Sequence, residues 1–295
     1  MSYLLGIFIA IAAGVVSNVG MLMQKKAIND LPEEEKKIGK GLFKKPLWLS
    51  GIIIGVILAA ALFFLANTPQ WGVGAALVPG LAASGLIILT IGSIKLLNEE
   101  VTKHDVLGIL LMIGGIALLG FSELEIKIVD TSIFSNIGFL IRAIVFTLTF
   151  VGISISCQIL QKTREKYRGI LLAVYSGSMF AMQNLWVAFV MGLFGPVFGS
   201  GRYLILFAIT CIIIIIGNVM GIFKIQQAYL YGEVSKLIPV QNGPMQIGPI
   251  FIYFAIFMWA PPKVYSLPFM IGGVILILSS SIFLAKRQAQ LEEIK

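Results

Sequence analysis

The segment QQAYLYGEVSKLIPVQN, residues 226–242, decides the fold that this sequence predicts. Much of its pattern already occurs 160 residues earlier, in NTPQWGVGAALVP at residues 67–79. The residues paired at this offset are Asn67 with Gln227, Gly72 with Gly232, and Pro79 with Pro239. Each segment is a polar hinge between two apolar stretches. Because a buried proline leaves a carbonyl group without its helical donor, that carbonyl needs a polar partner or a cavity. We therefore predict a transport site between flexible hinges. The predicted hinge residues are Gly72, Pro79, Gly232, Pro239 and Pro244.

The composition places the chain in a membrane. Hydrophobic residues make up 58% of the sequence, charged residues make up 12%, and the mean hydropathy is +0.96. Soluble domains carry roughly 25% charged residues, so we predict an integral membrane protein whose main partner is the lipid bilayer. Because each helical span needs about 20 apolar residues, we expect an all-α fold, a single bundle of nine transmembrane helices. The predicted spans are residues 3–23, 46–65, 72–96, 105–121, 135–160, 169–193, 203–225, 235–259 and 267–285.

The distribution of basic residues predicts the orientation. Eighteen of the 22 Lys and Arg residues lie in or beside the loops after the first, third, fifth and seventh spans, or in the C-terminal tail. Basic loops stay cytoplasmic, so we predict an outside N-terminus, a cytoplasmic C-terminus and a location in the plasma membrane. Lys25, Lys26 and Lys236 end their spans on this side, where we expect them to reach the headgroups. Glu233 has helical spacing for a pair with Lys236.

Short matches at a nearly constant offset predict an internal repeat. MQK at residues 23–25 matches MQN at residues 182–184, and IGG at residues 113–115 recurs at residues 271–273. Four spans plus one connecting span would turn the second copy upside down, which makes an inverted 4+1+4 repeat. The predicted units are residues 1–122 as the first repeat, 123–168 as the connecting span with an inner loop, 169–286 as the second repeat, and 287–295 as a cytoplasmic tail.

The chain resembles the drug/metabolite transporter superfamily, whose two halves form an inverted pair. The residues that carry this resemblance are LLNEEVTKHDVLGILLMIGGIALLGF at residues 96–121, which is similar to the EamA-type pattern of a Glu-containing loop followed by a glycine-bearing helix. The QKKAI after the first span and the LVP and LIP pair resemble the NIPA-type magnesium transporter branch more specifically. That resemblance implies transport of Mg²⁺. The sequence departs from the pattern because Thr is missing before both prolines.

Polar side chains at membrane depth are the candidates for a substrate pathway. A buried amide costs free energy unless it is hydrogen-bonded, and such residues face the bundle interior, where contact between helices is the alternative role. Three prolines within residues 239–249 are expected to prevent a regular helix in the eighth span. We expect the first, third, sixth and eighth spans to surround a polar cavity. The candidate pathway residues are Asn18, Gln24, Asn67, Gln183, Asn184, Asn218, Lys224, Gln227, Gln241, Asn242 and Gln246.

Several kinds of site are missing from the sequence. No Asp or Glu lies well inside a predicted span, so we expect no protein-held metal site, and a magnesium ion would have to pass hydrated. Cys157 and Cys211 lie in apolar segments and form no metal-binding or redox motif. The motifs of hydrolases and nucleotide-binding enzymes are also missing. We therefore expect no enzyme activity and no cofactor, and the charge pattern gives no indication of nucleic-acid binding.

These observations favour a membrane transporter that moves a small polar metabolite or an ion by alternating access. The alternative within this class is a NIPA-like magnesium transporter. A non-transporting membrane scaffold is the alternative from another class, and a water-sized cavity at the eighth span would distinguish a carrier from a scaffold. The sequence is compatible with assembly as a homodimer.

Overall fold

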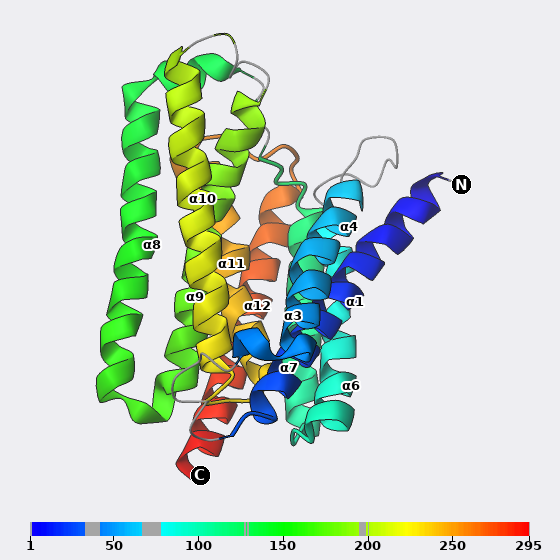
Figure 1. Cartoon of the computed structure of the whole chain (residues 1–295). Coiled ribbons are helices and arrows are strands. Elements are labelled where there is room, and N and C mark those ends of the chain that lie inside the picture. The colour runs from blue at the N-terminus through cyan, green and yellow to red at the C-terminus, as the bar shows by residue number, and fades with distance from the viewer. Residues whose placement is uncertain are drawn as a thin grey trace.

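The fold is a bundle of long helices (Figure 1). The structure, a computed structural model, describes residues 2–32, 42–66, 78–126, 128, 130–194, 199 and 201–294, and every regular element in them is helical. The α-helices are α1 (Ser2–Asn29), α3 (Pro46–Ile52), α4 (Ala59–Ala66), α5 (Val78–Ala82), α6 (Gly85–Leu97), α7 (Lys103–Phe121), α8 (Ile137–Thr163), α9 (Arg168–Leu193), α10 (Gly201–Ala228), α11 (Val234–Phe251) and α12 (Ser266–Ile294). Two π-helical segments continue them, η2 (Ile53–Leu58) and η7 (Ile252–Ile256), and short 3-10 turns are η1 (Leu42–Lys44), η4 (Thr131–Ser135) and η5 (Glu165–Tyr167).

The prediction of an all-α membrane protein is confirmed in the described residues. Eight helical segments there are long and apolar enough to cross a membrane. Each overlaps one of the nine predicted spans, but the eighth predicted span, residues 235–259, is not among them. That segment forms helix α11, in which three prolines and several amides lower the hydropathy. The count of nine spans therefore remains a prediction.

Helix α9 is the central helix. Helices α8, α10 and α11 all pack against it, and it is the most buried of the eight candidate spans, whereas α10 is the least buried. Helix α1 packs against α3, η2 and α4 and also against α5 and α6. Helices α7 and α12 pack along each other and join the two halves of the chain.

Several glycines allow helices to approach each other closely, and Gly20 and Gly177 are two examples. A Cβ atom at Gly20 of α1 would lie 2.2 Å from the Cα atom of Gly55 in η2. A Cβ atom at Gly177 of α9 would lie 2.2 Å from the carbonyl oxygen of Gln241 in α11. Real Cβ atoms essentially never approach closer than 3.0 Å, so any larger residue would force these helices apart.

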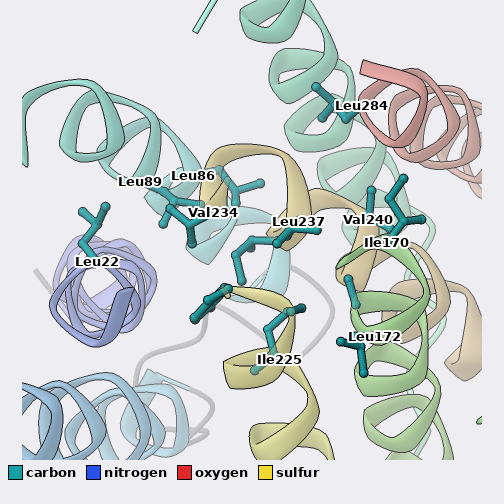
Figure 2. Packing of buried hydrophobic residues seen from close by; sticks show 14 of the residues in the cluster. Leu22, Leu86, Leu89, Ile170, Leu172, Ile225, Val234, Leu237, Val240 and Leu284 are labelled. Carbon is teal, nitrogen blue, oxygen red and sulfur yellow. The ribbon is translucent and has the colours of Figure 1, made fainter. Parts of the chain in front are cut away.

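The largest apolar core joins residues that are far apart in the sequence. Figure 2 shows Leu86 and Leu89 of α6 beside Val234 and Leu237 of α11, with Leu22 of α1 close to them. Val234 and Leu237 are fully buried. The core lies where α1 and α10 end and α11 begins, and we call this end of the bundle the basic end. Here apolar packing holds the first half (residues 1–122) against the second half (residues 169–286).

Helix α11 corrects the expectation of an irregular eighth span. Its residues are helical from Val234 to Phe251 despite Pro239, Pro244 and Pro249 inside it. The interruption lies in the first half instead, where α5 ends at Ala82 and α6 begins at Gly85. Helix α12 also extends to Ile294, through most of the predicted tail.

Candidate functional site

Gln24 is the centre of a buried hydrogen-bond chain between the two halves. Its Nε2 donates to the carbonyl oxygen of Gly51 at 2.9 Å, and its Oε1 accepts a hydrogen bond from Nε2 of Gln226. The indole N–H of Trp48 donates to Oε1 of Gln226 at 3.1 Å. The chain ties α1 and α3 to α10. The sequence analysis named Gln24 and Gln227 but not Gln226. The side chains of Gln226 and Gln227 point to different sides of α10, and the sequence does not show which of the two faces Gln24.

Gln241 connects α11 to α9 and α10. Its Nε2 donates to the hydroxyl of Ser176 at 2.8 Å, and that hydroxyl donates to the carbonyl oxygen of Gly221 at 2.7 Å. Both side chains are buried. The close approach at Gly177, one residue along α9, makes this arrangement possible. The predicted pathway residue Gln241 thus lies at the contact of three helices.

Asn184 satisfies a carbonyl group that a proline has left without a donor. Pro249 has no N–H, so the carbonyl four residues earlier, on Met245, loses its helical partner. Nδ2 of Asn184 in α9 donates to this oxygen at 3.4 Å. On the other side of α11, the hydroxyl of Ser281 in α12 donates to the carbonyl oxygen of Pro239 at 3.2 Å. A donor from α9 therefore compensates for Pro249, one of the three prolines inside α11.

Three buried amide oxygens have no hydrogen-bond partner among the described residues: Oε1 of Gln158 in α8 and, among the predicted pathway residues, Oδ1 of Asn18 in α1 and Oε1 of Gln183 in α9. The other end of the Asn18 side chain donates to the carbonyl oxygen of Gly14 at 2.8 Å. A buried acceptor without a donor costs free energy. The oxygens of Asn18 and Gln183 are therefore places where a water molecule or the water shell of an ion would be stabilised.

The remaining predicted pathway residues within the described part of the chain lie on α10 and α11. Nδ2 of Asn218 donates to Ile214 within its own helix at 3.1 Å. Lys224 is buried and donates to Oε1 of Gln227 at 3.0 Å. Asn242 and Gln246 are half-buried on α11.

The predicted hinges have different structural settings. Pro79 lies in the short helix α5, Gly232 lies in the turn before α11, and Pro239 and Pro244 lie inside α11. Asn67 and Gly72 lie outside the described residues. The π-helical segments η2 and η7 are additional irregular regions that sequence reasoning did not find.

Lys25 and Lys236 correct the expectation that they reach the lipid headgroups. Lys25 is 8% exposed, and its ammonium group donates to the carbonyl oxygens of Tyr229 and Gly232. Lys236 is fully buried, and it forms the predicted ion pair with Glu233. Backbone carbonyls and carboxylates at the basic end thus replace water around both ammonium groups. Lys26 is exposed, as a headgroup contact requires.

Two acidic residues, Asp105 and Glu99, complete this arrangement. The carboxylate of Asp105 is fully buried and lies 3.7 Å from Nζ of Lys236 and 3.9 Å from Nε of Arg287. Asp105 also forms a capping box with Thr102 at the start of α7. Glu99, in the loop after α6, is 8% exposed and accepts hydrogen bonds from the start of α11. The following residues are called the charged junction: Lys25, Glu99, Asp105, Glu233, Lys236 and Arg287.

A polar cavity of about 330 Å³ adjoins the charged junction. Its lining includes Lys25, Asn98, Glu99 and the chain from Tyr229 to Glu233. Burial and, to a smaller extent, the negative charge of Glu99 raise the pKa of the Tyr229 hydroxyl above its usual value. A second cavity, of about 350 Å³, lies at the opposite end beside η4. Among the described residues, no group of three His, Cys, Asp or Glu side chains could hold a metal ion.

Comparison with known families gives one match that covers most of the chain. The model of a family described as "Magnesium transporter NIPA" matches residues 1–260. No curated protein and no solved structure matches the chain.

Proposed function

Because the chain belongs to the magnesium transporter NIPA family, we propose that this membrane transporter moves Mg²⁺ across the plasma membrane by alternating access. The observation that carries this proposal is the family match over residues 1–260, which includes α1 to α11. We propose the orientation given by the basic residues, in which the basic end faces the cytoplasm.

The buried polar groups suit a hydrated ion. Mg²⁺ gives up its water reluctantly and keeps several water molecules in most protein sites. The outer face of such a water shell donates hydrogen bonds, and the free oxygens of Asn18 and Gln183 can accept them. We therefore propose that the ion passes between α1, α6, α9 and α11 with its water shell, guided by amide and carbonyl oxygens.

An inverted repeat would supply the two moving units, and corresponding contacts support it. In the first half α1 packs against α6 and the segment of α3, η2 and α4, and in the second half α9 packs in the same way against α11 and α10. Gln24 lies against Gly51, and its repeat counterpart Gln183 lies against Gly217. Each of these glycines begins a Gly-x-x-x-Gly sequence, a pattern that lets membrane helices approach closely.

The proposal can be tested with purified protein in lipid vesicles that contain a magnesium-sensitive dye. We expect a Mg²⁺ flux above that of empty vesicles, and we expect the double substitution Gln241→Leu and Asn242→Leu to abolish it. Gln290→Leu is the matched control, because Gln290 is an exposed amide near the end of α12. Expression should also restore growth of a strain deficient in magnesium uptake. Well-folded protein that moves no Mg²⁺ in either assay would contradict the proposal, and flux of a small polar metabolite would then identify the other substrate class.

A further inference from the structure

The start of helix α11 is capped by a residue from the other half of the chain. The first N–H groups of a helix have no partner within that helix, and the residue in the N-cap position, Glu233, makes no side-chain hydrogen bond to cap it. Instead, Glu99 accepts hydrogen bonds from the N–H of Val234 at 2.7 Å and the N–H of Ser235 at 3.1 Å. It also accepts one from the Ser235 hydroxyl at 2.7 Å.

The carboxylate suits this position for two reasons. The N-terminus of a helix carries partial positive charge, which favours an anion. Hydrogen bonds to an ionised group are also stronger than those between neutral groups. A single carboxylate in the loop after α6 therefore holds the first turn of α11, although 135 residues separate Glu99 from Val234.

Other contacts of the charged junction cross between the halves at the same level. Lys25 of α1 donates to the carbonyl oxygens of Tyr229 and Gly232, just before α11. Lys236 of α11 donates to the carbonyl oxygen of Glu100 at 2.9 Å and faces the carboxylate of Asp105. The halves are thus connected on both sides of the Glu99 cap.

Apolar packing and a polar cavity both adjoin this cap. Leu86 and Leu89 meet Val234 and Leu237 next to it (Figure 2). The cavity of about 330 Å³ has room for roughly ten water molecules, at about 30 Å³ each. Water therefore has space to reach Glu99, and separation of the leucines would let it continue along α11.

We infer that Glu99 is a positioning residue that keeps the basic end of the transporter closed by holding the N-terminus of α11 against the first half. The inference rests on the proposed function, because it assigns this contact to one step of alternating access. In the closed arrangement Glu99 binds the start of α11. In the open arrangement the cap is broken, α11 separates from the loop after α6, and water hydrates both groups.

The test compares Glu99→Gln with Glu100→Gln. Both substitutions remove one negative charge, but the Glu100 side chain is exposed, whereas that of Glu99 is buried. A reporter cysteine, Leu237→Cys, is introduced together with Cys157→Ala and Cys211→Ala. A membrane-impermeant thiol reagent is then applied to the basic end in membrane vesicles without Mg²⁺. Since Leu237 is fully buried, slow labelling is expected in the closed protein.

We expect Glu99→Gln to raise the labelling rate by about tenfold, because it weakens hydrogen bonds to a charged group. Glu100→Gln should leave the rate unchanged. Glu99→Asp is a second variant that keeps the charge but shortens the side chain, and it should raise the rate by a smaller factor. If both Glu99 variants label as slowly as Glu100→Gln, the inference is wrong.

The labelling test and the Mg²⁺ flux test of the proposed function can fail independently of each other. Labelling is measured without Mg²⁺, so an increased rate in a protein that moves no Mg²⁺ would support the closing role of Glu99 and contradict only the substrate. A normal Mg²⁺ flux with unchanged labelling would support the proposed function and contradict the closing role of Glu99. After detergent unfolding, equal reactivity of the reporter cysteine in the parent protein and in all three Glu variants is the control for the chemistry of the reporter.

Discussion

Substitution Gly177→Ala tests the close packing on which the proposed pathway depends. The added Cβ atom would lie 2.2 Å from the carbonyl oxygen of Gln241, whereas real contacts are at least 3.0 Å. Because that oxygen belongs to the backbone, helices α9 and α11 have to separate by nearly 1 Å. The separation also stretches the hydrogen bond between Gln241 and Ser176.

The expected cost follows from opposing effects. Overpacking of this kind destabilises a fold by about 1–3 kcal/mol, and the higher helix propensity of alanine returns up to about 1 kcal/mol. The hydrogen bond to Ser176 contributes about 0.6 kcal/mol more if it breaks. We therefore expect Gly177→Ala to reduce the free energy of unfolding by roughly 1–2 kcal/mol.

Gly152→Ala provides the matched control, because a Cβ atom at Gly152 of α8 meets nothing within 4 Å. That variant should keep or slightly raise the stability through helix propensity. Thermal melting of the purified proteins in detergent should show a Tm for Gly177→Ala that is lower by about 2–4 °C per kcal/mol. The Mg²⁺ flux of Gly177→Ala should also fall. Equal Tm values for the two alanine variants would refute the packing argument.

Two further predictions concern helix α11 and the orientation. Asn184→Leu should destabilise the protein less in a Pro249→Ala background, because an alanine in place of this proline supplies the N–H that the Met245 carbonyl lacks. Thermal melting of the parent, the two single variants and the double variant should give a coupling free energy of about 0.6 kcal/mol. Additive effects would exclude the proposed role of Asn184. Cysteines that replace the exposed residues Lys44 and Asp130 should react with impermeant reagents from the cytoplasm and from outside, respectively, and the reverse pattern would overturn the orientation.

The class of fold could be predicted from the sequence because it depends on local hydropathy. Long apolar stretches fix the helices, and the pair of Glu233 with Lys236 follows from helical spacing. The sequence also predicts that a carbonyl group freed by a proline needs a donor. Asn184 supplies that donor to the carbonyl of Met245. Each of these features depends on chemistry within a few residues of the chain or on one general rule.

The partners at the basic end could not be predicted, because they are far apart in the sequence. Glu99 binds backbone N–H groups more than 130 residues away, and backbone groups leave no pattern in the sequence. Lys25 was interpreted as a headgroup contact because its acceptors, the carbonyl oxygens of Tyr229 and Gly232, are likewise invisible. The continuity of α11 could not be predicted, because the donor for its Met245 carbonyl comes from another helix, α9.

We propose that the charged junction suits a reversible closure. A transporter needs two arrangements that differ by only a few kcal/mol, so that a substrate can shift the balance. Apolar packing alone favours the closed arrangement by about 25 cal/mol for each Å² buried. Buried charges act in the other direction, because the desolvation of groups such as Asp105 and Lys236 offsets most of their mutual attraction. When the halves separate, water hydrates these charges and compensates for the lost contacts. Since Glu99 contributes attraction to the closed arrangement through the helix N-terminus, the loss of this one carboxylate should change the balance more than the loss of an exposed one.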